Sequence, residues 1–176
     1  MIIFGIGIEE NMKKEVTKEK ALERLEGLCS RSEQCEFDLN RKMINWGLSS
    51  ANRKEIMESL RDNRYVDDSR FARSFTNDKA RFSSWGPNKI RMELIKRRLP
   101  SSIITESLRN VEPEVWKEGL LKNALSKAKN LDLTGEEGWK NRQKLFRYIV
   151  GRGFPSSSAS KAVNLMKKRQ EEASDD

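Results

Sequence analysis

The sequence of 176 residues contains no histidine, and its only cysteines are Cys29 and Cys35. Without histidine, the chain cannot use an imidazole as a general base or as a metal ligand. Two cysteines cannot form a disulfide scaffold, or a zinc site without other ligands, so we expect free thiols in a reducing cytosol. A serine or cysteine nucleophile would also lack its usual base. The sequence therefore predicts a protein that is not an enzyme and that has no cofactor, no metal site and no catalytic residue.

The sequence also lacks a long hydrophobic run. The apolar stretch MIIFGIGI at 1–8 is too short to span a bilayer, and no basic residue precedes it as in a signal peptide. We therefore expect residues 1–16 to form a disordered or non-native extension. We also expect a cytoplasmic protein with no membrane partner.

The residues that are present favour helices and anionic partners. Leu, Lys, Arg, Glu and Ser dominate and β-branched residues are sparse, which indicates an all-α chain. With 36% hydrophobic and 35% charged residues, thin layers of amphipathic helices are favoured over one deep core. The net charge of +8 favours a polyanion, either nucleic acid or a protein that carries it.

An internal repeat divides the chain. Leu99–Ser102 matches Phe154–Ser157 at an offset of 55 residues, and Leu39, Met43 and Leu48 lie 51 residues before Ile90, Leu94 and Leu99. The pattern predicts three three-helix repeats, at 17–64, 65–111 and 112–170, and a frayed acidic tail at 171–176. Because such units bury little surface alone, we expect tandem repeats stacked into an elongated curved monomer.

The segment between Tyr65 and Pro100 raises the question of a catalytic site. Paired carboxylates such as Asp67 and Asp68 can hold Mg²⁺, but no third carboxylate lies nearby at ligand spacing. Asp67 stands where a helix N-cap is expected. Gly86 permits an unusual backbone angle and Pro87 suits a first helical position, so we expect a turn that Trp85 closes by packing on both helices. This segment is therefore predicted to be structural rather than catalytic.

The basic residues of this segment predict a binding surface. Between Arg61 and Pro100 there are eleven basic and five acidic residues. At 100° per residue, Phe71, Phe75 and Phe82 share an inward face, so the arginines of that helix project outward. Arg91 and Arg98 share a flank with no acid three or four residues away, whereas Lys89, Lys96 and Arg97 can pair with Glu93. The predicted partner-binding or DNA-binding residues are Arg70, Arg73, Arg81, Lys89, Arg91, Lys96, Arg97 and Arg98.

Three stretches of the chain resemble a known family. YVDDSRFARSF at 65–75, WGPNKIRMELIKR at 85–97 and the Leu-Pro turn that follows closely resemble RecX, the bacterial regulator of RecA. RSEQCEFDLNRKMINWGL at 31–48 is similar to the first-repeat helix of that family, with Cys35 where serine is usual. The resemblance covers Thr17 to Arg169, is weakest in the third repeat and does not include residues 1–16.

The resemblance implies a regulator that binds the RecA–single-stranded DNA filament along its helical groove. It implies stoichiometric inhibition of the RecA ATPase, coprotease and strand-exchange activities, with direct contact to the single-stranded DNA as an additional expectation. Two other functions remain open. Three-helix units resemble a helix-turn-helix, so the chain could be a general DNA-binding protein, and its basic charge would also suit a helical scaffold for acidic proteins.

Overall fold

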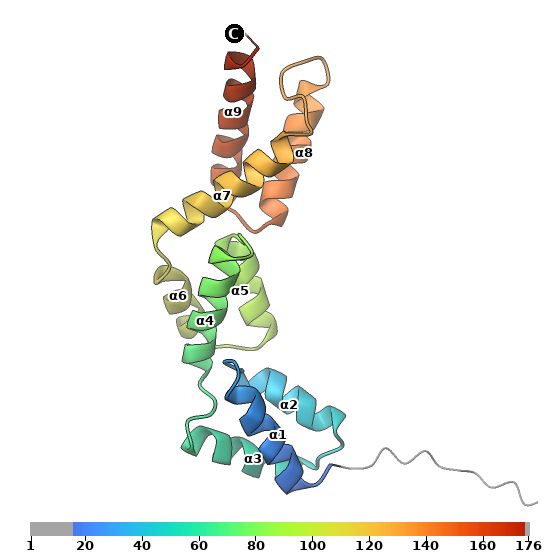
Figure 1. Ribbon diagram of the computed structural model, residues 1–176, viewed down its shortest axis with the longest axis vertical. Coiled ribbons are helices and arrows are strands. Elements are labelled where there is room, and N and C mark those ends of the chain that lie inside the picture. The colour runs from blue at the N-terminus through green and yellow to red at the C-terminus, as the bar shows by residue number, and fades with distance from the viewer. Residues whose placement is uncertain (1–15, 175–176) are drawn as a thin grey trace, which may run out of the picture. The chain divides into compact units, whose positions relative to one another are not determined.

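The computed structural model describes residues 16–174, which form nine α-helices and no strand (Figure 1). The predicted all-α class is therefore confirmed for these residues. The chain divides into two compact units with a boundary between Asp67 and Asp68. Except for Val16, the predicted extension at 1–16 lies outside the described residues, as do the last two residues of the predicted acidic tail.

The first unit contains α1 (Lys18–Cys29), α2 (Glu36–Asn45) and α3 (Ser50–Asp62). Side-chain caps mark two of the helix starts: Thr17 accepts from the Lys20 amide at 3.4 Å, and Ser49 accepts from the Asn52 amide at 3.2 Å. Cys35 precedes α2 without a side-chain cap bond. The fully buried large side chains of this unit are Leu25, Leu39, Met43, Ile56 and Leu60. They come from all three helices, so the unit has its own core.

A short turn follows α3 at the end of the first unit. Tyr65 and Val66, which come after this turn, pack against the core of that unit. Arg64 supports the turn by adopting a left-handed conformation, with φ of 57°. Helix α4 then begins at Asp68, which leaves Asp67 in the predicted N-cap position.

The second unit contains two three-helix groups, which correspond to the second and third predicted repeats. The first group is α4 (Asp68–Arg81), α5 (Pro87–Lys96) and α6 (Ser101–Arg109). The second is α7 (Pro113–Ala128), α8 (Gly138–Gly151) and α9 (Ser156–Glu172). Helix α7 packs against α8, α9 and α4, and α8 lies beside α9 (Figure 1). Because α9 continues to Glu172, the first two residues of the predicted acidic tail are helical.

Phe82 corrects the predicted inward face of α4. Phe71 is buried as expected and stacks on Phe75 at 5.6 Å between ring centroids, but Phe82 is 80% exposed. Helix α4 ends at Arg81, and the Phe82 amide still donates to the Asp78 carbonyl at 2.9 Å, as in a helix. The other buried residues of the helix are Ala72, Thr76 and Ala80, which shifts the inward face away from Phe82.

Two glycines join the second and third repeats by direct backbone contact. The Gly86 amide donates to the Arg152 carbonyl at 2.8 Å, and the Asn88 amide donates to the Gly153 carbonyl at 2.9 Å. A Cβ on Gly86 would lie 2.3 Å from the Gly153 carbonyl carbon. Gly86 has an ordinary φ of −80°, so it is required for this close approach and not, as predicted, for an unusual backbone angle. Pro87 is the first residue of α5, as predicted.

Polar side chains reinforce the same junction. Buried Asn123 of α7 donates to the Ser84 carbonyl at 2.8 Å and accepts from the Tyr148 hydroxyl at 3.3 Å. Arg152 donates to the Ser83 carbonyl. Since these bonds connect α7 and α8 to the turn between α4 and α5, they hold the two repeats of the second unit together.

Candidate functional site

The predicted arginines of α4 lie on its outer side. Arg73 and Arg81 are exposed, whereas Arg70 is half-buried. The Arg81 guanidinium lies 3.8 Å from the Glu112 carboxylate, an exposed pair that adds little to stability. On this side of α4, Arg73 and Arg81 can therefore reach an external partner.

A different surface, formed by α4, α5 and their connecting turn, carries alternating cations and aromatic rings. The Arg97 guanidinium lies 5.1 Å from the Phe75 ring centroid, and the Lys79 ammonium lies 5.5 Å from the same ring. Lys79 also lies 5.2 Å from the Trp85 ring centroid, which the Lys89 ammonium approaches to 4.3 Å. We call these five residues the cation–aromatic row.

The rings of the row restrain its cations. Each cation over an aromatic face gains about 0.5–2 kcal/mol from the ring quadrupole. Arg97, Lys79 and Lys89 are thereby held at separate positions before any ligand arrives, which lowers the conformational entropy that binding removes. Such a spaced set of positive charges suits a polyanion. Trp85 contacts cations of both flanking helices, in agreement with its predicted role in closing the turn.

The sequence predicted Lys89 and Arg97 but missed the other members of the row. Lys79 follows Phe75 by four residues, and Lys89 follows Trp85 by four. This i, i+4 spacing of aromatic and basic residues is a signal that could have found part of the row. The contact of Lys79 with Trp85 crosses the turn after α4, and no helical spacing predicts it.

Glu93 lies next to the row and holds two of the predicted cations. Lys96 donates to its carboxylate at 2.7 Å and Arg97 at 3.3 Å, so the predicted pairing is confirmed for these two residues. The hydrogen bond from Lys96 is the main reason that the pKa of Glu93 lies below its usual range, and Arg97 adds to the shift. Glu93 therefore remains negative near neutral pH and competes with an external anion for Lys96 and Arg97.

Replacing Glu93 with glutamine should release Lys96 and Arg97 for an anionic partner. We expect Glu93→Gln to bind a polyanion several-fold more tightly at moderate salt, with a steeper salt dependence, because about one more cation becomes available. Titration of a single-stranded oligonucleotide at several salt concentrations measures both changes. Glu106→Gln on α6 makes the same charge change without a pairing to Lys96 or Arg97 and should have a smaller effect. Equal affinities for the wild-type chain and Glu93→Gln would contradict this role of Glu93.

Arg91 and Arg98 do not share a helical flank with the row. Arg91 is exposed and follows Lys89 by two residues, which is about 200° around α5. Arg98 is also exposed, but it lies beyond the end of α5 at Lys96, so the predicted seven-residue spacing along one helix does not describe it. The eight predicted residues therefore lie on several surfaces, and only Lys89 and Arg97 belong to the row.

Arg98 adopts a backbone conformation that favours glycine. Its φ is 58°, in the left-handed region. The equivalent turns of the first and third repeats have Gly47 with φ of 83° and Gly153 with φ of 94°. A residue with a side chain pays about 1–2 kcal/mol for this conformation. The second repeat therefore keeps an exposed arginine at a position where the other two repeats have the more stable residue.

Replacing Arg98 with glycine should stabilise the protein and weaken partner binding. Removing the backbone strain should raise the free energy of unfolding by about 1 kcal/mol, offset in part by the greater freedom of glycine in the unfolded chain. The lost guanidinium should lower the affinity for a polyanion about threefold to tenfold. Thermal unfolding and oligonucleotide titration measure the two effects. Arg98→Lys, which retains the charge and the strain, should resemble the wild-type chain in both; lower stability of Arg98→Gly would be the contrary result.

The structure shows neither a metal site nor a membrane-spanning helix among the described residues. Residues 16–174 contain no group of three or more Cys, Asp or Glu side chains placed to hold a metal ion. No helix within that range has the length and apolar character needed to cross a membrane.

Comparison with known proteins places these features in a family. Residues 67–108, which include the whole row, match the family model for the second three-helix domain of RecX. Regulatory protein RecX of Mannheimia succiniciproducens is 31% identical over 72% of this chain and 81% of its own length. Regulatory protein RecX of Clostridium botulinum strain Alaska E43 is 28% identical over 78% of this chain. The chain spans 62% of the length of that clostridial relative.

Solved structures agree with the sequence comparison. A crystal structure of regulatory protein RecX, 26% identical, aligns with a TM-score of 0.71 over 86% of this chain and 71% of that one. RecX from Lactobacillus salivarius, 16% identical, aligns with a TM-score of 0.70 over 85% of this chain and 96% of that one. The latter likeness supports the fold alone.

Proposed function

The chain belongs to the RecX family of regulatory proteins, and from this premise we propose that it regulates RecA. It binds the RecA–single-stranded DNA filament stoichiometrically, as a cytoplasmic monomer, and inhibits ATP hydrolysis, coprotease activity and strand exchange. We propose binding rather than catalysis as the mode of action, and the absence of histidine from the chain is consistent with it.

The cation–aromatic row is the observation that carries this proposal. Lys79, Lys89 and Arg97 lie within the segment that matches the RecX family model. A filament of RecA on DNA offers both carboxylates and phosphates, and arginine can bind either through its planar fork. We propose the row as the principal contact. The arginines on the other surfaces, Arg70, Arg73, Arg81, Arg91 and Arg98, and Lys96 are further contacts of the same repeat.

Addition of the protein to matched RecA on single-stranded DNA tests this function. The rate of ATP hydrolysis should fall as the protein is added and reach a plateau at a defined ratio to RecA. An unchanged rate at saturating protein would contradict the proposal. Tight binding to naked duplex DNA with a sequence preference, and no effect on RecA, would instead favour a general helix-turn-helix DNA-binding function.

A further inference from the structure

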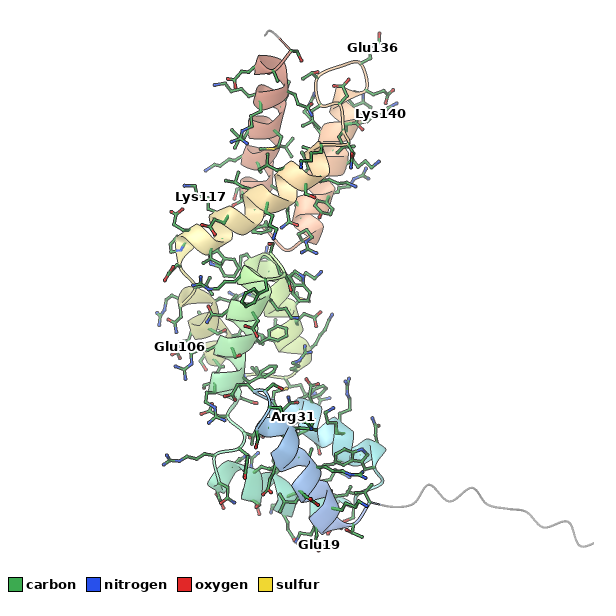
Figure 2. The ribbon with its side chains drawn as sticks, in the orientation of Figure 1. Glu19, Arg31, Glu106, Lys117, Glu136 and Lys140 are labelled. Atoms are coloured by element: carbon green, nitrogen blue, oxygen red, sulfur yellow. The ribbon has the colours of Figure 1, made fainter. Side chains whose placement is uncertain are left out.

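A second basic and aromatic surface lies on the first unit, along α1 and beside the end of α2. It is an open hollow of about 500 Å³. Its lining consists of three cations (Lys20, Arg24 and Arg31), the carboxylate of Glu23, and the uncharged residues Gly27, Leu28 and Trp46. Arg31 lies just past the C-terminal end of α1, at the opposite end of that helix from Glu19 (Figure 2). We call this surface the Trp46 hollow.

The Trp46 hollow concentrates positive charge locally. Residues 16–67 contain ten basic and ten acidic residues, so the described part of the first unit has no net charge. Three of the four charged residues that line the hollow are nevertheless basic. Lys20 and Arg24 lie four residues apart on one side of α1, and Arg31 joins them from just past the C-terminal end of that helix. An anion is therefore favoured at this surface even though residues 16–67 together are neutral.

Trp46 gives the hollow an aromatic wall. It is half-buried, and the Arg24 guanidinium lies 5.7 Å from its ring centroid. A planar guanidinium and an indole can both stack on a nucleobase, and each stacked base contributes about 1–3 kcal/mol. A cationic rim with an aromatic wall is the combination that proteins use to bind single-stranded nucleic acid.

Gly27 leaves space in the hollow but lowers the stability of α1. It lies within the helix, where glycine is less stable than alanine by about 1 kcal/mol. A Cβ at this position would meet nothing within 4 Å, so no neighbouring residue requires glycine here. Gly86 differs in this respect, because a Cβ there would lie 2.3 Å from the Gly153 carbonyl carbon. The missing side chain leaves open space in this part of the hollow, where the Arg31 guanidinium donates to the Gly27 carbonyl at 2.9 Å.

We propose that the Trp46 hollow binds one nucleotide of a single-stranded nucleic acid. The base stacks against Trp46 and Arg24, and the adjoining phosphates contact Lys20 and Arg31. Bases of a duplex are stacked and paired, so they cannot enter the hollow in the same way. This site depends on residues of the first unit alone. A negative result at the Trp46 hollow would therefore leave the proposed regulation of RecA untouched. Likewise, a failure of that proposal would leave the hollow untouched.

Photochemical cross-linking of the unaltered full-length chain tests the site directly. A single-stranded oligonucleotide that carries 5-iodouracil should cross-link to Trp46 on irradiation, with the site identified by mass spectrometry. The same sequence as a duplex should give at least tenfold less of this product. Cross-links confined to other residues, or equal yields from single-stranded and duplex DNA, would overturn the proposal.

Two further variants check the charges and the space. The double variant Arg24→Gln, Arg31→Gln should lower the yield of the Trp46 cross-link at least fivefold. The control variant Arg41→Gln, Lys54→Gln removes the same charge from other positions of the unit and should leave that yield nearly unchanged. Gly27→Gln retains the charge and should preserve the helical circular dichroism signal, but its side chain occupies the hollow and should lower the cross-link. Equal losses from both arginine and control pairs, or no loss from Gly27→Gln, would also refute the site.

Discussion

Replacing Gly153 with alanine should lower the free energy of unfolding of the second unit by about 4 kcal/mol. The φ of this residue is +94°, which costs a residue with a side chain about 1–2 kcal/mol. A Cβ would also lie 2.3 Å from the Lys89 Cβ and 2.5 Å from the Lys89 amide nitrogen. Relief of these contacts requires the backbone of α5 to move, and overpacking of this kind costs about 1–3 kcal/mol. Urea unfolding followed by circular dichroism measures the loss.

Gly151 provides a control two residues away. A Cβ there would meet nothing within 4 Å, and the residue ends α8. Gly151→Ala should therefore leave stability unchanged or raise it by up to about 1 kcal/mol. Gly86→Ala should resemble Gly153→Ala, because its Cβ would lie 2.3 Å from the Gly153 carbonyl carbon. Similar unfolding midpoints for Gly153→Ala and Gly151→Ala would show that the two repeats do not depend on this close backbone contact.

Replacing the three cations of the row with glutamine should weaken filament binding on the order of 100-fold at moderate salt. Lys79 and Lys89 are held over the rings of Phe75 and Trp85 and need no reordering, whereas Arg97 must exchange its bond to Glu93 for one to the partner. If they contact phosphates of the single strand, the slope of log affinity against log salt should also fall by about 2. Fluorescence anisotropy of labelled RecA–DNA filaments, repeated at several salt concentrations, measures both quantities.

A matched triple variant on α8 separates a local contact from a general effect of charge. Lys140→Gln, Lys144→Gln and Arg147→Gln remove the same three charges from the third repeat. Because salt screens charges that do not touch the partner, this variant should lose less than about fivefold in affinity. An equal or larger loss from the α8 variant would move the interface out of the second repeat.

Local patterns in the sequence predicted the helices and their repetition. The recurrence of Leu39 and Met43 as Ile90 and Leu94 reflects inward positions one helical turn apart, and all four side chains are fully buried. Pro87 occupies the first turn of α5, as predicted, where its fixed φ is favourable. These features depend on residues close together in the chain, so periodicity and capping preferences suffice to find them.

Features that depend on distant residues were not predictable in the same way. The need for glycine at 86 arises from the approach of Gly153, a segment of the next repeat. The inward assignment of Phe82 failed because Ala72, Thr76 and Ala80 shift the buried face of α4 away from Phe82. Only part of the row follows a local spacing, since its central contact between Lys79 and Trp85 forms across a turn. The proposed binding surface thus depends on the packing of α4 on α5 rather than on either helix alone.

Cosedimentation with preformed RecA–single-stranded DNA filaments tests the proposed function most directly. Increasing amounts of the protein are added, and the bound protein and the rate of ATP hydrolysis are measured in the same samples. We expect binding to saturate at a constant ratio to RecA and hydrolysis to fall in proportion to the bound protein. Absence of the protein from the filament pellet, or saturated filaments that hydrolyse ATP at the original rate, would contradict regulation of RecA by stoichiometric binding.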